Sequence, residues 1–216
     1  MKKIAIILSG CGVYDGSEIH EATMALLAVK RNGAEYEIYA PDKTQYDVVN
    51  HFNGQQSDEY RNVLVEAARI ARGNINPLKE LDVKTVDAIL FPGGFGVAKN
   101  LSSYAFKGAE YDVIPEVKEL IKAVHAMGKP IGAMCIAPIL LAKSLEKVTI
   151  TVGSSSDAAA KAAEGAGAAH VDTASGNICV DKANKVATAP CYMLDASIVN
   201  IFEEADKVVK ELLSMM

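Results

Sequence analysis

The sequence predicts an α/β protein in which a mostly parallel sheet is covered by helices on both faces. Short continuous aliphatic runs, typical of strands buried on both faces, recur along the chain. Amphipathic helical patterns separate most of these runs, and strands that alternate with helices in this way build parallel sheets. Reactive groups in such folds gather at the carboxyl ends of the strands. The residues that follow each strand are therefore the first candidates for function.

Each expected strand is recognised by its aliphatic and β-branched residues and by a glycine or polar residue near its end. Gly10 follows the first, and the last two flank Asn184 and are expected to form a hairpin. The expected strands are residues 3–8, 35–40, 87–91, 130–134 and 148–152, followed by the hairpin at 178–180 and 186–188.

Helices are expected where apolar residues recur three or four positions apart. Ser17 is the expected cap of the first helix, whose apolar positions include Ile19 and Leu27. Asp58 is expected to cap the second, whose apolar face begins at Tyr60. The remaining expected helices are residues 113–127, residues 136–143 and a C-terminal helix with Ile198, Ile201, Ala205, Val208 and Leu212 on one face.

Residues 42–80 contain no obvious strand and include Asp47, Asn50, His51 and Asn53. We interpret this segment as an insertion at the rim of a single domain that spans residues 1–216. A solvated loop with one packing helix and a lid over a substrate both fit the segment.

Composition limits the partners and the location. The chain has 22 basic and 27 acidic side chains, a net charge of -5 and no run of Lys or Arg, which argues against a nucleic-acid partner. The four cysteines have no CxxC spacing, so we expect no metal site and a reducing cytoplasm. The apolar run at residues 4–8 is shorter than a signal-peptide core, and no segment has the length of a membrane span.

The sharpest local signal is Cys135, which lies between an expected strand and an expected helix, as a nucleophile elbow does. Gly132 would let the strand and the helix approach closely, and Pro138 suits a first helical turn. A thiol at a helix N-terminus is expected to have a lowered pKa and to be a thiolate at neutral pH. A cysteine that only packs is the alternative, and it is the favoured interpretation of Cys11, Cys179 and Cys191.

Two further segments that follow strands contain candidate functional groups: backbone NH groups in one and carboxylates in the other. In residues 92–96 the glycines would let backbone NH groups approach a ligand closely, as an oxyanion hole opposite Cys135 requires, although a plain tight turn also fits. Residues 16–21 place Glu18 and Glu21 in a first helical turn, where a carboxylate beside the thiol could hold or relay a proton. Either glutamate could instead only favour the helix N-terminus by its charge.

The glycines at 10, 12 and 16, with Asp42 after the second strand, imitate a dinucleotide-binding fingerprint. That fold places a pyrophosphate at the helix N-terminus, where Glu18 and Glu21 would repel it. Dinucleotide binding is therefore a minor alternative, and we expect no cofactor.

Four collinear segments carry a family resemblance over nearly the full chain. They are ILSGCGVYDGSEIHEA at 7–22, FPGGFGVAKNLSSYA at 91–105, GKPIGAMCIAPILLAK at 128–143 and KVATAPCYML at 185–194. The chain resembles the ThiJ/PfpI superfamily and, within it, the ElbB type, also called enhancing-lycopene-biosynthesis or class I glutamine amidotransferase-like proteins. The resemblance implies a flavodoxin-like three-layer sandwich and a homodimer.

The resemblance also implies site roles. In the superfamily a glutamate twelve residues before the glycine that closes the first helix hydrogen-bonds the elbow cysteine, and Glu21 stands twelve before Gly33. The NH groups of Gly94 and of Ile136 would form the oxyanion hole. Further residues expected near the substrate pocket are Gly93, Glu18, His20, His51 and Asn100.

The chain departs from the family pattern in its histidines. Many relatives place a histidine directly after the cysteine, where this chain has Ile136, and others place one about twenty residues later, where it has residues 151–153, Thr-Val-Gly. No third catalytic residue is identified, and we do not expect protease or amidotransferase activity. His20 and His51 are candidates by neighbourhood only, whereas His125 and His170 are expected to be structural.

Two functions remain open. The resemblance to the ElbB type implies a cofactor-independent glyoxalase-type enzyme, in which Cys135 attacks glyoxal or methylglyoxal and the product is glycolate or lactate. The alternative is a non-catalytic redox or carbonyl-stress sensor, in which the same thiol is oxidised to a sulfinate. Both require a small aldehyde or an oxidant to reach Cys135.

Overall fold

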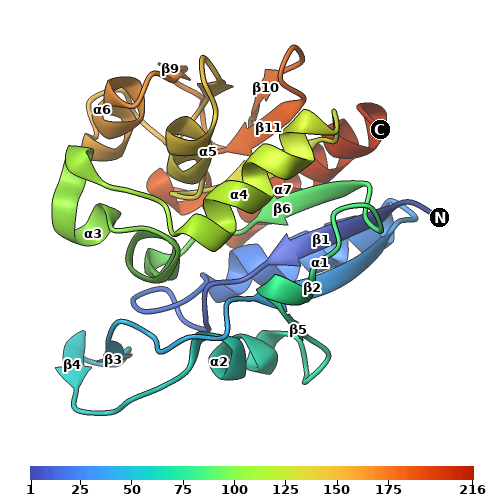
Figure 1. The fold of residues 1–216 in the computed structure, drawn as a ribbon. Helices are drawn as coiled ribbons and strands as arrows, with labels where there is room; N and C mark the ends of the chain where they lie inside the picture. The colour runs from blue at the N-terminus through green and yellow to red at the C-terminus, as the bar shows by residue number, and fades with distance from the viewer.

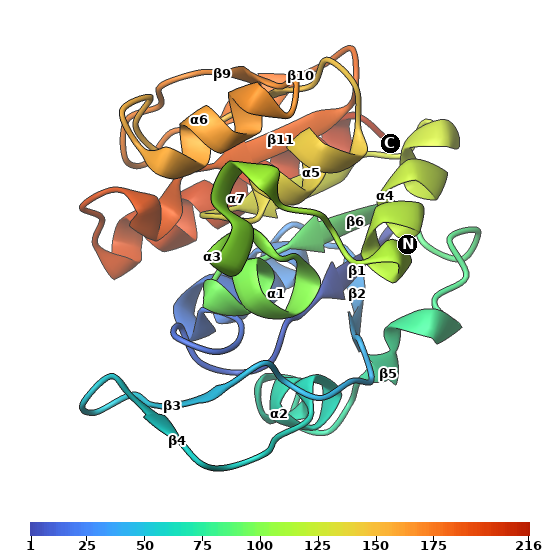
Figure 2. The same ribbon diagram turned by 60° about the vertical axis from the view of Figure 1, so that its left-hand side comes forward.

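The computed structural model describes residues 1–216 and contains a seven-stranded sheet between two helical layers (Figures 1 and 2). The strand order is β10-β11-β7-β6-β1-β2-β5, and only the β10–β11 pair at one edge is antiparallel. The predicted α/β fold with a mostly parallel sheet is confirmed. The strands of this sheet are β1 (Lys3–Ile7), β2 (Glu35–Ala40), β5 (Asn76–Pro77), β6 (Ala88–Phe91), β7 (Ile131–Met134), β10 (Cys179–Asp181) and β11 (Val186–Ala189).

Successive side chains of the central strands point to opposite faces of the sheet, and each face packs in its own hydrophobic core. On β1, Ile4 and Ile6 face one core, and Ala5 and Ile7 face the other. The first core includes apolar residues of α1, α2 and α7, and the second those of α4, α5 and α6. No helix combines the length and apolar composition that crossing a bilayer requires. The helices are α1 (Ile19–Arg31), α2 (Val63–Ile70), α3 (Tyr104–Lys107), α4 (Pro115–Ala126), α5 (Pro138–Ser144), α6 (Ala158–Gly165) and α7 (Ile198–Ser214).

The first helix differs from its prediction in its cap and in its buried face. Glu18, not Ser17, is the N-cap, because its side chain accepts the NH of Glu21. Ile19 and Leu27 are 44% and 46% exposed, and the buried side is made largely of alanines that pack against α7. Small side chains let two helices approach closely. They do not mark the buried face of a helix in the sequence as clearly as large apolar residues do.

Residues 42–80 contain more regular structure than predicted. β3 (Val48–Asn50) and β4 (Gln55–Ser57) form a hairpin, and β5 extends the edge of the main sheet. The helix is shorter than predicted, because α2 begins at Val63 with Asn62 as its cap rather than Asp58. Tyr60 lies before the helix and is 93% exposed, so its assignment to an apolar helical face is wrong.

The expected strand at 148–152 forms, but outside the main sheet. β8 (Thr149–Ile150) pairs in parallel with β9 (Ala169–His170), and the two form a separate small sheet. The helix between them, α6, was not predicted, because its sequence AAAKAAEG shows no large apolar residue at helical spacing. Its position matters for function, because the start of α6 lies beside the site described next.

Candidate active site

Cys135 occupies the predicted elbow at the end of β7. Its φ is 59°, in the left-handed region that side chains rarely adopt, and its NH donates to the carbonyl of Ala189 at 2.8 Å. Strained backbone of this kind persists where the surrounding structure holds it, as at functional sites. The helix begins later than predicted, since α5 starts at Pro138 and is only seven residues long.

Loops from two neighbouring strands close over this elbow. The NH of Glu18 donates to the carbonyl of Gly93 at 2.9 Å, and the NH of Phe95 donates to the carbonyl of Val13 at 2.7 Å. These bonds tie the segment after β1 to the segment after β6, which places both beside Cys135. The segments expected to carry chemistry therefore lie together at the carboxyl ends of the parallel strands.

Glu21 lies fully buried against Cys135. Its Oε2 accepts the NH of Gly93 at 2.9 Å, and this oxygen and the sulfur of Cys135 both lie against Gly93. Burial, with the charge of Glu18 as a second cause, raises the pKa of Glu21 to about 8. At neutral pH this carboxyl group is therefore mostly protonated, and it exchanges its proton close to physiological pH.

The pKa of Cys135 is shifted in the direction opposite to the prediction. Burial of the sulfur raises the pKa of the thiol well above its ordinary value, and the neighbouring Glu21 carboxylate raises it further. The prediction of a thiolate favoured by the helix dipole is wrong, because the helix is short and the residue is only 7% exposed. Cys135 and Glu21 thus titrate as a coupled pair. The form of the pair that has lost one proton is the one in which Glu21 can accept the proton of the Cys135 thiol.

Two backbone NH groups point at the sulfur, those of Gly94 and Ile136, and both favour the thiolate. Gly94 has a φ of 101°, and a β-carbon there would lie 2.3 Å from the NH nitrogen of Glu18. At Gly93 a β-carbon would lie 2.4 Å from the β-carbon of Cys135 and 2.6 Å from Oε2 of Glu21. Only glycine at both positions permits this approach of backbone to nucleophile.

A cavity of about 410 Å³ opens onto Cys135 and is lined mainly by apolar side chains. Sequence reasoning identified its floor, which includes Cys135, Ile136 and Gly94, and also Glu18. It missed residues from segments far apart in the chain. Among these are Tyr104, Asp157, Tyr192 and Met193. Tyr192 lies within the segment KVATAPCYML that carried the family resemblance, which is the one signal that could have found it.

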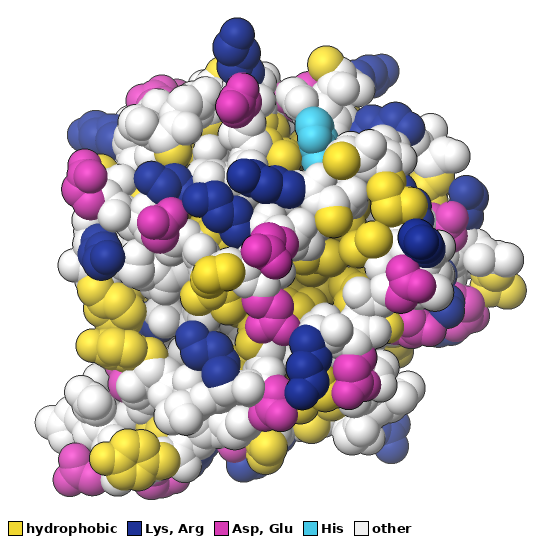
Figure 3. Space-filling view, in the orientation of Figure 1, with side chains coloured by type: hydrophobic (Ala, Val, Ile, Leu, Met, Phe, Trp, Pro, Cys, Tyr) yellow, Lys and Arg dark blue, Asp and Glu magenta, His cyan; other side chains and the backbone are white.

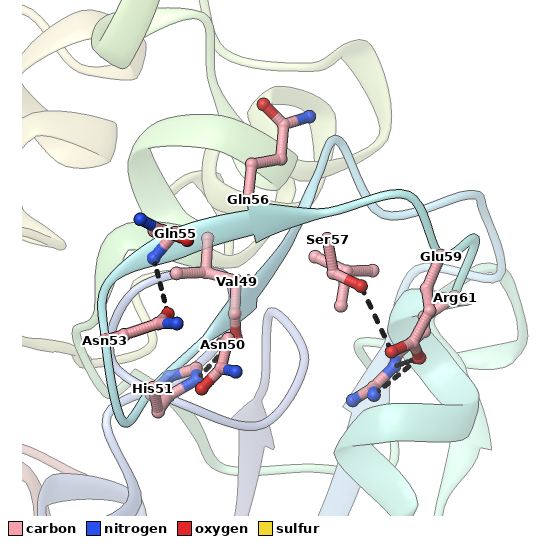
Figure 4. Close-up of a pocket in the computed structure, with 10 residues that line it drawn as sticks. Val49, Asn50, His51, Asn53, Gln55, Gln56, Ser57, Glu59 and Arg61 are labelled. Atoms are coloured by element: carbon pink, nitrogen blue, oxygen red, sulfur yellow. Dashed lines mark hydrogen bonds and ion pairs between the residues drawn. The ribbon is translucent and has the colours of Figure 1, made fainter.

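Gly93 does not line this cavity, and three other predicted pocket residues also lie outside it. Nδ1 of His20 lies 2.8 Å from the hydroxyl of Tyr192, so this histidine reaches the site only through the tyrosine. Asn100 is buried and donates its amide to the carbonyls of Ser9 and Asp15, which is a structural role. His51 belongs to the β3–β4 hairpin and lines a separate polar cavity of about 500 Å³ (Figure 4).

The histidines predicted to be structural are held by other parts of the chain. Nε2 of His170 accepts the NH of Val152 at 3.2 Å, and Nε2 of His125 lies 3.2 Å from Oδ1 of Asn184. No group of three or more His, Cys, Asp or Glu side chains is arranged to hold a metal ion. Neither histidine lines the cavity that opens onto Cys135.

Replacement of Glu18 by glutamine is expected to lower the titration midpoint of the Glu21 carboxyl group below about 8. The charge of Glu18 raises the pKa of Glu21, whereas the amide oxygen of glutamine can still cap the helix. An NMR titration of ¹³C-labelled glutamate carboxyl groups measures the midpoint, with Glu203→Gln on the exposed face of α7 as the control. An unchanged or higher midpoint would contradict this electrostatic coupling.

The fold and the site together define a class of protein: an α/β sandwich with a cysteine in a strand-to-helix elbow and a buried glutamate beside it. The chain belongs to the DJ-1/PfpI family, whose sequence model matches residues 2–195. Its fold is accordingly the flavodoxin-like, class I glutamine amidotransferase-like sandwich that the sequence predicted.

Individual relatives support this assignment. The chain is 44% identical over 222 residues to the human glutamine amidotransferase-like class 1 domain-containing protein 3, mitochondrial, with 99% of this chain and 83% of that protein aligned. A crystal structure of an isoprenoid biosynthesis protein with an amidotransferase-like domain from Ehrlichia chaffeensis has a TM-score of 0.93 and 33% identity, covering 100% and 99% of the two chains. Glyoxalase III from Candida albicans shares the fold, with a TM-score of 0.64 at 14% identity over 100% of this chain and 97% of that one.

The prediction of a cytoplasmic location is wrong on this comparison. The human relative is named as a mitochondrial protein, and so are the ES1 protein homologue of Rattus norvegicus and the ES1 protein of Danio rerio. These two are 43% and 33% identical to this chain, cover 99% and 98% of it, and are themselves covered over 84% and 85% of their lengths. Net charge and cysteine spacing, on which the prediction rested, do not distinguish one reducing compartment from another.

Proposed function

We propose that the protein is a cofactor-independent glyoxalase-type enzyme that converts glyoxal or methylglyoxal into glycolate or lactate. The observation that carries this proposal is the coupled Cys135–Glu21 pair, placed under a cavity and beside two NH groups directed at the sulfur. A nucleophile, an acid–base group and an anion hole are the parts that this chemistry needs.

The first step uses the proton that the pair shares. The thiol of Cys135 gives its proton to the ionised Glu21, and the sulfur attacks the aldehyde carbon to form a hemithioacetal. The NH groups of Gly94 and Ile136 stabilise the negative charge that develops on the aldehyde oxygen. Because the pKa of Glu21 is about 8, this carboxyl group can both take and return a proton near neutral pH.

The second step moves a proton between the two carbons of the substrate. Glu21 first returns the thiol proton to the aldehyde oxygen of the hemithioacetal and is a carboxylate again. It then removes the proton of the carbon bonded to the sulfur, the hydroxyl proton of that carbon moves to the neighbouring oxygen, and Glu21 delivers its proton to the neighbouring carbon. The result is a thioester of a 2-hydroxy acid, and water releases the acid and restores the thiol. The departures in the histidine pattern are compatible with this route, because one carboxyl group performs both proton transfers.

The structure gives less support to the alternative of a redox sensor. Oxidation of a cysteine is favoured by thiolate character and by exposure. Cys135 has a raised pKa and is 7% exposed, so it lacks both properties. The apolar cavity above the sulfur instead fits a small organic molecule.

The test is product formation by the purified protein, without added thiol or cofactor. We expect glycolate from glyoxal and lactate from methylglyoxal, measured by chromatography against protein-free controls. Absence of any 2-hydroxy acid above that background would refute the proposed activity.

A further inference from the structure

A second cavity, of about 710 Å³, lies between α4 and the C-terminal ends of α5 and α6. It shares no residue with the cavity over Cys135. Its lining includes four lysines and a histidine: Lys118, Lys122, Lys143, Lys147 and His125. Figure 3 shows Lys or Arg side chains gathered over the region where Figure 1 draws α4 and α5.

The positive charge of this lysine cavity is poorly balanced by the chain itself, although the protein as a whole carries a net charge of -5. Lys118 pairs with Asp112 at 3.4 Å, and Lys143 lies over the ring of Tyr111 at 5.4 Å. Lys122 and Lys147 make no ion pair, and the one acidic residue of the lining, Glu146, is exposed. Favourable interaction with helix C-termini explains single cations near those ends, but it does not require four lysines around one cavity.

The histidine of the lysine cavity is held in a fixed orientation. The Asn184 amide Nδ2 donates to Oδ2 of Asp181 at 2.8 Å, and the Asn184 backbone NH donates to Oδ1 of Asp181 at 3.0 Å. Oδ1 of Asn184 therefore faces Nε2 of His125 at 3.2 Å and accepts its proton. This chain of bonds orients the ring and leaves Nδ1 of His125 without a protein partner.

A buried hydroxyl completes the lysine cavity. Ser144 belongs to the lining, is 7% exposed, and its Oγ has no hydrogen-bond partner. Leaving a buried hydroxyl unpaired has a free-energy cost. A ligand oxygen that accepts from this group would remove that cost.

We propose that the lysine cavity binds a small molecule that carries a phosphate group. Ammonium groups and a hydroxyl donor match the oxygens of a phosphate. The volume exceeds that of a bare phosphate ion and suits a phosphorylated metabolite, within the range of ordinary ligand pockets of about 300–1,000 Å³. The free energy of binding comes mainly from the lysines, and Ser144 fixes the position of the phosphate.

The experiment is isothermal titration of the protein with pyrophosphate and with ribose 5-phosphate at low salt. We expect saturable binding with a Kd below about 1 mM. The double variant Lys122→Ala/Lys143→Ala should weaken binding at least about tenfold, because it removes two charges from the cavity. The control Lys84→Ala/Lys161→Ala removes the same charge from exposed positions elsewhere and should bind within about twofold of the wild type.

Ser144→Ala separates a binding role from a packing role. We expect it to weaken binding about threefold or more while leaving the free energy of unfolding of the unliganded protein equal or higher, because the unpaired hydroxyl is gone. Absence of saturation with both probes up to about 10 mM, or equal weakening by both double variants, would overturn the proposal. Binding only to vesicles that contain phosphatidic acid, with no binding of either soluble probe, would also overturn it in favour of a membrane surface.

Discussion

Replacement of Cys135 by serine is expected to reduce the formation of glycolate and lactate by about 10³-fold or more. Serine keeps the size of the side chain, and its hydroxyl can still meet the NH groups of Gly94 and Ile136. Its much higher pKa, however, prevents proton loss to a carboxyl group that titrates near 8. The measurement is kcat/KM for methylglyoxal with the wild type and the variant at the same pH.

The matched control is Cys179→Ser. Cys179 is also a buried cysteine with a raised pKa, but it lies on the edge strand β10 and does not line the cavity over Cys135. We expect this variant to retain activity within about twofold. Comparable activity in the Cys135→Ser variant would show that the sulfur is not the nucleophile.

Glu21→Gln is expected to remove activity and, at alkaline pH, to stabilise the fold. The pKa of Glu21 is raised from 4.5 to about 8 in the folded protein, so its ionisation opposes folding. Its contribution to stability is fully present below pH 4.5 and is lost as the pH rises through about 8. At pH 8–9 the glutamine variant should therefore exceed the wild type in free energy of unfolding, by on the order of 2–4 kcal/mol.

Denaturant unfolding of both proteins at pH 4.5 and pH 8.5 checks this expectation, with the difference small at the lower pH. Turnover should fall by about 10²–10⁴-fold, since glutamine cannot take or return the proton. A variant that is less stable than the wild type at pH 8.5 would show that the wild-type carboxylate is well solvated or well paired. Retained turnover would remove Glu21 from the mechanism.

The central sheet was predictable from the sequence because its strands are continuous aliphatic runs. The helices were predictable only where large apolar residues mark the buried face, as on α4 and α7. On α1 and α6 the buried face consists largely of alanines, so the prediction chose exposed residues on the first and missed the second. The short strands in residues 42–80 form through pairing with partners that local sequence does not reveal.

The residues around Cys135 were predictable from the sequence, but the pKa shifts within the site were not. Cys135 and the segments after β1 and β6 meet because the ends of parallel strands converge at one edge of the sheet, whereas Glu21, Gly94 and Ile136 were singled out by the family resemblance. The direction of the pKa shift of Cys135 was not predictable, because it depends on burial and on a carboxyl group from another strand end. Asp157 was missed for a similar reason, since it reaches the cavity from the start of the unpredicted α6.

The pH dependence of Cys135 alkylation by iodoacetamide, followed by mass spectrometry, tests the coupling of Cys135 to Glu21 most directly. In the wild type we expect the rate to reach its midpoint well above the ordinary thiol range, because burial and the Glu21 carboxylate both oppose ionisation. In Glu21→Gln the midpoint should move to lower pH, because the charge that opposes the thiolate is gone. A wild-type midpoint near or below the usual thiol pKa of about 8.5, or an upward shift in the variant, would contradict the account.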